Sequence, residues 1–120
     1  MLATKKRNGI DALVTAHAAA CLRDFVHDVS KTLGPRLSQI VLFGSRARGD
    51  SHGSSDYDVA VFVRDIEDRR ALDHLLSDLA YRHVLDGVHI RPVALAAGFL
   101  EKPSESALAA SIIRDGVALR

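Results

Sequence analysis

The sequence has little of what would mark a secreted or membrane protein. Its 120 residues include one cysteine, no basic-then-apolar leader and no apolar run near eighteen residues. A single cysteine cannot form a disulfide within the chain, and a membrane-spanning helix needs about twenty predominantly apolar residues. We therefore expect a cytoplasmic protein in a reducing compartment, with Cys21 acting as a small core residue and no membrane contact.

The chain also lacks an excess of charge of either sign. It has 16 basic and 15 acidic residues and a net charge of +1. A dedicated nucleic-acid binder usually carries a strong basic patch, so duplex DNA is not an expected partner. Arg46, Arg48 and Arg64 lie close together in the sequence, which restricts attraction for phosphate to one region.

The six histidines do not form a recognisable zinc motif. Four of them fall in predicted helices without a Cys or His companion at the spacing of zinc ligands: His17, His27, His74 and His83. We therefore predict no structural zinc site. His52 lies in a loop rich in Gly and Ser, where a side chain is usually exposed, and its role stays open.

Size and composition indicate one small domain. An apolar content of 48% in 120 residues is enough for one core that buries roughly two thirds of the unfolded surface. No repeat, low-complexity tract or internal linker is visible, so residues 1–120 are predicted to be a single domain.

The periodicity of apolar residues predicts both helices and strands. Helices are expected from Ile10 to Leu33, ending at Gly34-Pro35, from about Ile66 to Leu85, and after Pro103 with Ser104 as N-cap. Apolar β-rich runs predict strands at 39–43, 59–63 and 88–93, and the segment 117–119 is expected to add a short strand or to dock on a partner. The expected fold is an α+β domain in which helices cover a small mixed sheet.

The connection between the first two strands carries the most informative motif. Gly44-Ser45 follows the first strand, and residues 45–48 are expected to form a single helical turn whose N–H groups and Ser45 hydroxyl bind phosphate. Asp56 and Asp58 are two residues apart at the second strand, which puts their side chains on one face with Cα atoms roughly 6.5 Å apart. Paired carboxylates of this kind suit one or two Mg²⁺ ions, with the remaining ligands supplied by a nucleotide.

The stretch GSRARGDSHGSSDYDVAVFV resembles the G-S-x10-D-x-D signature of minimal nucleotidyltransferases in the DNA polymerase β superfamily. The predicted helices and strands follow the order of that family, so the similarity covers most of the chain. The resemblance implies a polymerase-β-like core that transfers a nucleoside monophosphate from ATP or another NTP to a hydroxyl and releases pyrophosphate. Gly44 and Ser45 would then hold the terminal phosphates, Asp56 and Asp58 would bind the metal, and Arg46 would contact the nucleotide.

The same resemblance implies a third carboxylate on the next strand, where this chain has Arg91. Alternation along that strand places His89, Arg91 and Val93 on one face, and Pro92 favours an edge position because it cannot donate to a ladder. Without the third acid the attacking hydroxyl would lose its proton to water or phosphate, and general-base assistance is typically worth about 10²–10⁴-fold. Arg91 would instead bind the triphosphate, or it is an ordinary edge-strand arginine.

Two functional hypotheses follow from these residues. In the first, the chain is an active nucleotidyltransferase that uses Mg²⁺ and ATP. Small chains that resemble it often form the antitoxin half of a toxin–antitoxin pair and modify a helical HEPN ribonuclease, which would be the protein partner. In the second, the chain is a degenerate binding module that neutralises its partner by contact alone. The acceptor, the preferred base and the oligomeric state stay open.

Overall fold

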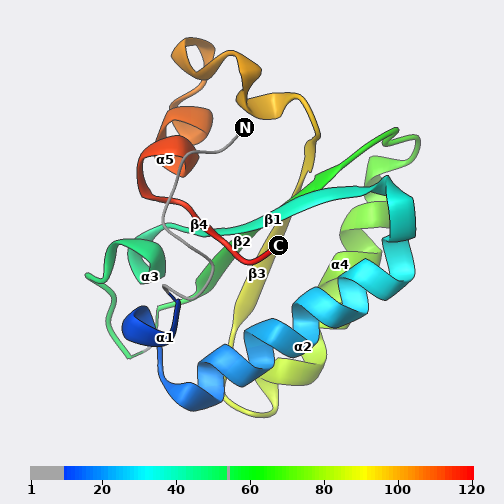
Figure 1. Cartoon of the computed structure of the whole chain (residues 1–120). Helices are drawn as coiled ribbons and strands as arrows, with labels where there is room; N and C mark the ends of the chain where they lie inside the picture. The colour runs from blue at the N-terminus through cyan, green and yellow to red at the C-terminus, as the bar shows by residue number, and fades with distance from the viewer. Residues whose placement is uncertain (1–9, 54) are drawn as a thin grey trace.

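Four strands form one mixed sheet in the order β3-β2-β1-β4 (Figure 1). The computed structural model describes residues 10–53 and 55–120. The strands are β1 (Leu37–Phe43), β2 (Tyr57–Val63), β3 (Ile90–Ala96) and β4 (Val117–Ala118). β1 pairs antiparallel with both β2 and β4, whereas β2 and β3 run parallel. The predicted α+β fold is confirmed, and segment 117–119 contributes the short strand.

The N-terminal helical region is two helices, so the prediction of one helix from Ile10 to Leu33 is wrong. α1 spans Ile10–Leu13 and α2 spans Ala16–Leu33. Between them Thr15 adopts an extended conformation, and its hydroxyl accepts a hydrogen bond from the N–H of Ala18 at 3.1 Å. A threonine that caps a new helix satisfies one of its free N–H groups, which a count of apolar periodicity does not detect. α2 ends at Gly34, as expected.

α4 and α5 also begin at side-chain caps. α4 (Arg69–Val84) begins after Asp68, whose carboxylate accepts from Ala71, so it is shorter at both ends than predicted. α5 (Ala107–Asp115) begins after Ser106, and the prediction of Ser104 as its N-cap is wrong. Ser104 lies instead in a short 3₁₀ segment, η4 (Pro103–Glu105), and the described residues also form η2 (Gly34–Arg36) and η3 (Phe99–Glu101). Proline readily starts a turn of this kind because its φ is already close to the helical value.

The sheet is covered on both faces. α2 and α4 pack on one face, and α5 with η3 lies on the other (Figure 1). On the first face the sheet contributes alternate strand residues, including Ile40, Leu42, Val59, Val61 and Ala94. On the second face it contributes the intervening ones, including Val41, Phe43, Ala60, Phe62 and Leu95. Cys21 is 6% exposed and belongs to the first core, as predicted.

Strand alternation decides which face carries the polar residues of the motif. Asp58 is two residues before Ala60, and Arg91 is two residues before Val93, so both belong to the face covered by α5. β3 is an edge strand, which confirms the expectation from Pro92. Among the described residues, no helix has the length and apolar character needed to cross a membrane.

Gly116 lies at the junction of α5 and β4, and a substitution there tests how closely α5 packs on the sheet. A Cβ atom here would collide with the backbone oxygen of Ile112 and lie 2.7 Å from Cγ1 of Val41. We expect Gly116→Ala to lower the free energy of unfolding by about 1–3 kcal/mol, measured by urea denaturation. Gly53→Ala is the matched control, since a Cβ there meets no described atom within 4 Å. Equal stability of the two variants would contradict the close packing of α5 on β1.

Candidate active site

The turn after β1 is built around Gly44. Its backbone has φ 77° and ψ −159°, a region that is essentially restricted to glycine. An added Cβ would lie 2.5 Å from Oδ2 of Asp58, so the backbone of this turn packs directly against that carboxylate. The following residues form α3 (Ser45–Arg48), the single helical turn that the sequence predicted. The hydroxyl of Ser45 has no hydrogen-bond partner in the described part of the chain and is available to a ligand.

The two aspartates differ in their surroundings. Asp58 lies within β2, opposite Phe43 of β1, and its side chain is 16% exposed. Asp56 precedes the strand and its side chain is 42% exposed, so the prediction that both lie within the strand is wrong for Asp56. Strand pairing begins at Tyr57, whose N–H donates to the carbonyl of His89. One carboxylate is therefore held by the sheet, while the other is more open to solvent.

Arg91 bridges this carboxylate pair. The parallel register of β2 and β3 places it directly opposite Asp58. Its Nε donates to Oδ1 of Asp58 at 2.8 Å, and its Nη1 lies 3.7 Å from Oδ2 of Asp56. The hydrogen bond to Asp58 and the charge of that carboxylate raise the pKa of Arg91 above its ordinary value. The position at which the family resemblance implies a third acid holds a cation in contact with both aspartates.

Arg46 stabilises the loop between the two halves of the motif. Its guanidinium donates to the carbonyls of Gly53 and Ser55 and to the hydroxyl of Ser51. It also stacks on the ring of Tyr57, 4.2 Å from the centroid, an arrangement that combines cation–π attraction with apolar contact. These four hydrogen bonds leave one of its five N–H donors, and contact between Arg46 and a nucleotide stays a prediction.

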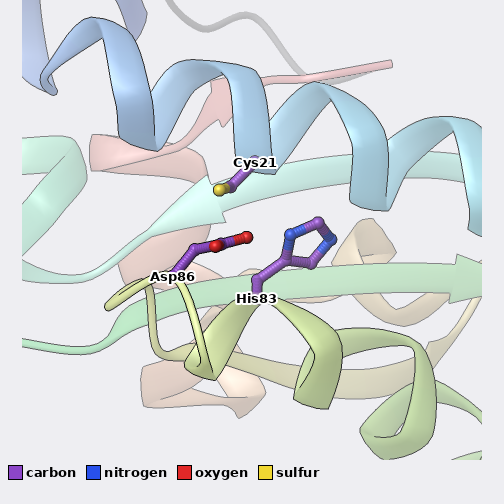
Figure 2. Close-up of side chains that lie close together, drawn as sticks. All are labelled: Cys21, His83 and Asp86. Atoms are coloured by element: carbon purple, nitrogen blue, oxygen red, sulfur yellow. The ribbon is translucent and has the colours of Figure 1, made fainter.

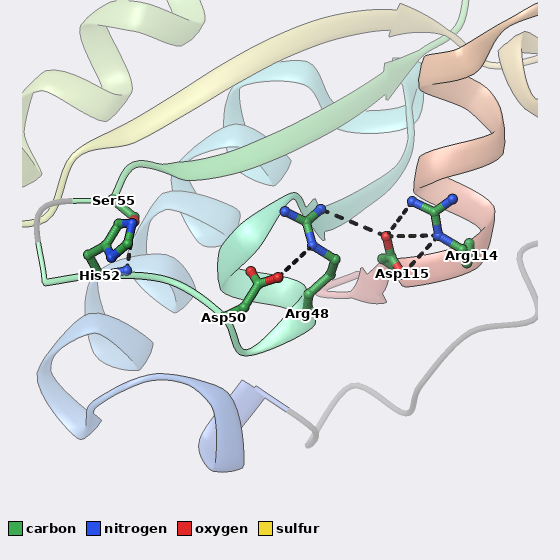
Figure 3. A network of polar contacts seen from close by, with 6 residues as sticks. All are labelled: Arg48, Asp50, His52, Ser55, Arg114 and Asp115. Carbon is green, nitrogen blue, oxygen red and sulfur yellow. Dashed lines mark hydrogen bonds and ion pairs between the residues drawn. The ribbon is translucent and has the colours of Figure 1, made fainter.

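A second arginine connects the phosphate turn to α5. Arg48 donates to Asp50 at 3.2 Å and lies 3.8 Å from Asp115, the last residue of α5 (Figure 3). Arg114 donates to the same Asp115 carboxylate. Asp115 therefore attracts two guanidinium groups and ties α3 to the layer that covers its face of the sheet. Sequence reasoning missed this link, because nothing local to Asp115 indicates its distant partner.

His52 lies at the tip of the loop. Its backbone N–H donates to Oγ of Ser55, and the residue is exposed, as predicted (Figure 3). The loop thus has a defined shape around Ser55, which receives bonds from both Arg46 and His52. No contact of the His52 ring with another described residue assigns it a role.

The donor set at the aspartate pair suits a hard divalent cation. Asp56 and Asp58 supply only oxygen atoms, and Mg²⁺ is usually held by one or two carboxylates with water and substrate phosphates completing its shell. Oδ2 of Asp58 faces the glycine turn, where a phosphate would lie beside the ion. The residues therefore fit Mg²⁺, and the predicted metal role of Asp56 and Asp58 is chemically consistent with their placement. An open pocket of about 330 Å³ adjoins Asp56 and Arg91 and extends to Tyr81 of α4.

One histidine has close neighbours that the sequence spacing did not indicate. Sequence spacing gave His83 no companion of metal-binding type, yet in the structure it lies beside Cys21 and Asp86. These residues come from α2, from the last turn of α4 and from the turn that follows it. Only the packing of the two helices brings them together.

Comparison with known proteins points to one family. The family described as "Polymerase beta, Nucleotidyltransferase" matches residues 29–119. The curated "Putative protein adenylyltransferase MJ0141" of Methanocaldococcus jannaschii is 40% identical over 45 residues, which are 38% of this chain and 46% of that protein. The match therefore spans less than half of that relative's length.

Solved structures share the fold. A nucleotidyltransferase structure from Sulfolobus solfataricus, whose assignment is itself described as putative, superposes with a TM-score of 0.60 at 20% identity, covering 84% of this chain and 78% of that one. A toxin–antitoxin structure with AMP-PNP gives a TM-score of 0.56 at 25% identity, and a mutant of the toxin–antitoxin MntA-HpeT gives 0.55 at 23%. Each of the last two comparisons covers 82% of this chain and 72% of the other.

The contact between Gly44 and Asp58 can be tested with two glycine variants. Gly44→Ala and Gly49→Ala both place a side chain at positive φ, which costs about 1–3 kcal/mol of unfolding free energy. Only Gly44→Ala also displaces Asp58, because a Cβ at Gly49 comes no closer than 3.5 Å to Leu13. We expect Gly44→Ala to lose affinity for Mn²⁺, which prefers the same oxygen ligands as Mg²⁺, while Gly49→Ala keeps it. Electron paramagnetic resonance of added Mn²⁺ measures this, and equal affinities would refute the assigned geometry.

Proposed function

Because the chain belongs to the polymerase β nucleotidyltransferase family, we propose that it transfers AMP from ATP to a hydroxyl group of a partner protein in a Mg²⁺-dependent reaction. The observation that carries this proposal is the contact of the Gly44 turn with the Asp58 carboxylate. In this proposal the turn binds the phosphates and Asp58 binds the metal, and their contact would let one nucleotide reach both. The curated relative described as a protein adenylyltransferase supports AMP as the transferred group.

Each residue of the turn has a distinct task in this proposal. The Ser45 hydroxyl and the free N–H groups at the start of α3 hold the terminal phosphates of ATP, and Gly44 permits their close approach. Asp56 and Asp58 hold Mg²⁺, which when bound would neutralise phosphate charge as the bond breaks. Arg46 keeps the loop folded over Tyr57, so that the two halves of the motif keep their spacing.

The reaction is an in-line displacement at the α-phosphorus. A bond forms between the acceptor oxygen and the α-phosphorus, and the bond from that phosphorus to the bridging oxygen of the β-phosphate breaks, which releases pyrophosphate. The acceptor proton passes to water, because β3 carries no carboxylate to receive it. The missing general base would lower the rate by about 10²–10⁴-fold relative to a site with one.

Arg91 acts as an internal counter-cation. Two carboxylates at this spacing repel one another, and the guanidinium relieves the repulsion before a metal binds. Mg²⁺ then has to compete with Arg91 for Asp58. Since Arg91 is two-thirds exposed, its pair with Asp58 is screened by solvent and can be displaced. The released guanidinium is well shaped to bind phosphate oxygens.

The acceptor we propose is a helical HEPN-type ribonuclease toxin, which would make this chain an antitoxin. Two of the structural neighbours are toxin–antitoxin proteins, and one of them was solved with AMP-PNP. The site lies at an open sheet edge beside the exposed side chain of Tyr81, which leaves room for a partner to present a hydroxyl. We also propose that the chain acts in the cytoplasm, because that is where a ribonuclease toxin would have to be modified.

The alternative is a binding module that neutralises its partner without transfer. The Asp58–Arg91 hydrogen bond favours this alternative, because a permanently paired carboxylate would leave the site without a complete metal ligand set. The two hypotheses differ in the role of Asp56 and Asp58. In the first they bind the metal for catalysis, and in the second they only support the conformation of the loop.

The first functional prediction concerns the two aspartates. In the double variant Asp56→Asn, Asp58→Asn we expect transfer of α-³²P-labelled AMP to the partner to fall by more than about 100-fold, because metal stabilisation is worth several kcal/mol. Thermal unfolding checks that the fold is kept. Asp78→Asn, on the exposed face of α4, is the control and should transfer normally.

The same variant separates the two hypotheses. If it transfers no label but still suppresses toxicity in cells, contact alone neutralises the partner and the binding module is correct. If wild type transfers no label under any condition while it binds the partner, the proposed transfer is wrong. Loss of both transfer and suppression in the double variant supports the enzyme.

A second prediction concerns the competition between Arg91 and the metal. Arg91→Gln removes the cation, so we expect half-maximal activation at a lower Mg²⁺ concentration, by about tenfold, with kcat kept or raised. Arg114→Gln is the matched control, because Arg114 is equally exposed and pairs with Asp115 in the same manner. A lower kcat at saturating Mg²⁺ would instead show that Arg91 binds the phosphates during transfer.

A further inference from the structure

A second cluster of potential metal ligands lies in the helical layer away from the aspartate pair. Cys21 of α2, His83 at the last turn of α4 and Asp86 in the following turn point toward one another (Figure 2). One ligand atom from each residue lies within 4.8 Å of the other two. The cluster is therefore a sulfur, a nitrogen and an oxygen donor converging between two helices.

His83 is the least expected member of this cluster. Its side chain is 2% exposed, and its Nε2 has no hydrogen-bond partner among the described residues. A buried polar group without a partner costs roughly 1–3 kcal/mol, so a histidine is an expensive choice for an ordinary core position. Figure 2 shows that the nitrogen turned toward Asp86 and Cys21 is the one bonded to Cγ, so Nδ1 is the candidate ligand atom and the unpartnered Nε2 lies on the other side of the ring. Burial lowers the pKa of His83, which keeps the imidazole in the neutral form that binds metals.

The surroundings of Cys21 favour a cation. Burial raises the pKa of its thiol, and the charges of Asp86 and Asp24 raise it further. The nearby Arg82 is paired with Asp28 at 2.7 Å, which offsets its positive charge. A divalent ion here would meet acidic groups and a thiol whose proton it can displace.

We propose that Cys21, His83 and Asp86 form a binding site for Zn²⁺, separate from the Mg²⁺ site. Zinc accepts thiolate, imidazole and carboxylate ligands, whereas Mg²⁺ prefers oxygen alone. Bond lengths of about 2.0–2.3 Å place tetrahedral ligand atoms roughly 3.3–3.8 Å apart, so the cluster has to contract by about an ångström. Asp86 is exposed, which gives the ion a route from solvent and leaves the fourth position to water.

The consequence of zinc binding would be a clamp between α2 and the end of α4. His17, one turn before Cys21, already donates through Nε2 to the carbonyl of Asp86 at 2.8 Å and holds this turn against α2. The same turn leads into β3, which carries Arg91. Zinc would therefore stabilise the chain segment that positions the edge strand of the active site.

The test uses tag-free, metal-free protein in the Asp56→Asn, Asp58→Asn background, so that the aspartate pair cannot contribute. Co²⁺ is titrated as a spectroscopic probe for Zn²⁺. We expect one equivalent to give a thiolate-to-cobalt charge-transfer absorption, and Zn²⁺ to abolish it by competition. Zn²⁺ should also raise the melting temperature, while Mg²⁺ at the same concentration leaves it unchanged.

Variants then assign the ligands. Cys21→Ser should remove the charge-transfer band, and His83→Gln and Asp86→Asn should each weaken Co²⁺ binding by at least about tenfold. His74→Gln, an exposed histidine of the same helix as His83, is the control and should bind normally. Because Asp86 is exposed, Asp86→Asn folds regardless of the core, and unchanged affinity in that variant overturns the site. The proposed site is also wrong if the folded protein with Cys21, His83 and Asp86 unchanged shows no thiolate-to-cobalt band.

Discussion

The position of β2 between β1 and β3 is the constraint on which the candidate active site depends. Its antiparallel register with β1 sets Asp58 opposite Phe43, so that the next residue, Gly44, packs against the carboxylate. Its parallel register with β3 sets the same Asp58 opposite Arg91. A shift of one residue on either side would turn Asp58 to the face of α2 and α4. The cost of burying an unpaired carboxylate in that core opposes such a shift.

The electrostatics of the site follow from that register. An isolated pair of carboxylates would be unfavourable, and the sheet supplies its own cation at the distance of a hydrogen bond. Arg91 therefore compensates the charge of the two carboxylates, and in the proposed reaction it would compete with the metal for Asp58. A carboxylate in place of Arg91 would reverse this balance, making the site more dependent on metal and better equipped to remove a proton. The residue at position 91 therefore decides whether this position compensates the charge of the aspartates or could assist catalysis.

Much of the fold could be predicted because its signals are local. Apolar β-rich runs predicted the three long strands, and the segment that follows Gly44 predicted the helical turn of α3. The failures occurred where a side-chain cap overrode the apolar pattern: Thr15 begins α2 in the middle of a predicted helix, and Ser106 begins α5 in place of Ser104. Both serines precede the same apolar run, and the sequence contains no local reason to choose between them.

The sequence by itself determined the chemistry of the candidate active site. The ten residues between Ser45 and Asp56 have the length of a connection between two strands, and the basic character of Arg91 is visible without coordinates. Only the tertiary structure decided what those residues contact. It paired Arg91 with Asp58 and brought Cys21 to His83 across two helices. Such contacts join residues far apart in the chain, and they arise from the packing of whole elements, which no local pattern of side chains encodes.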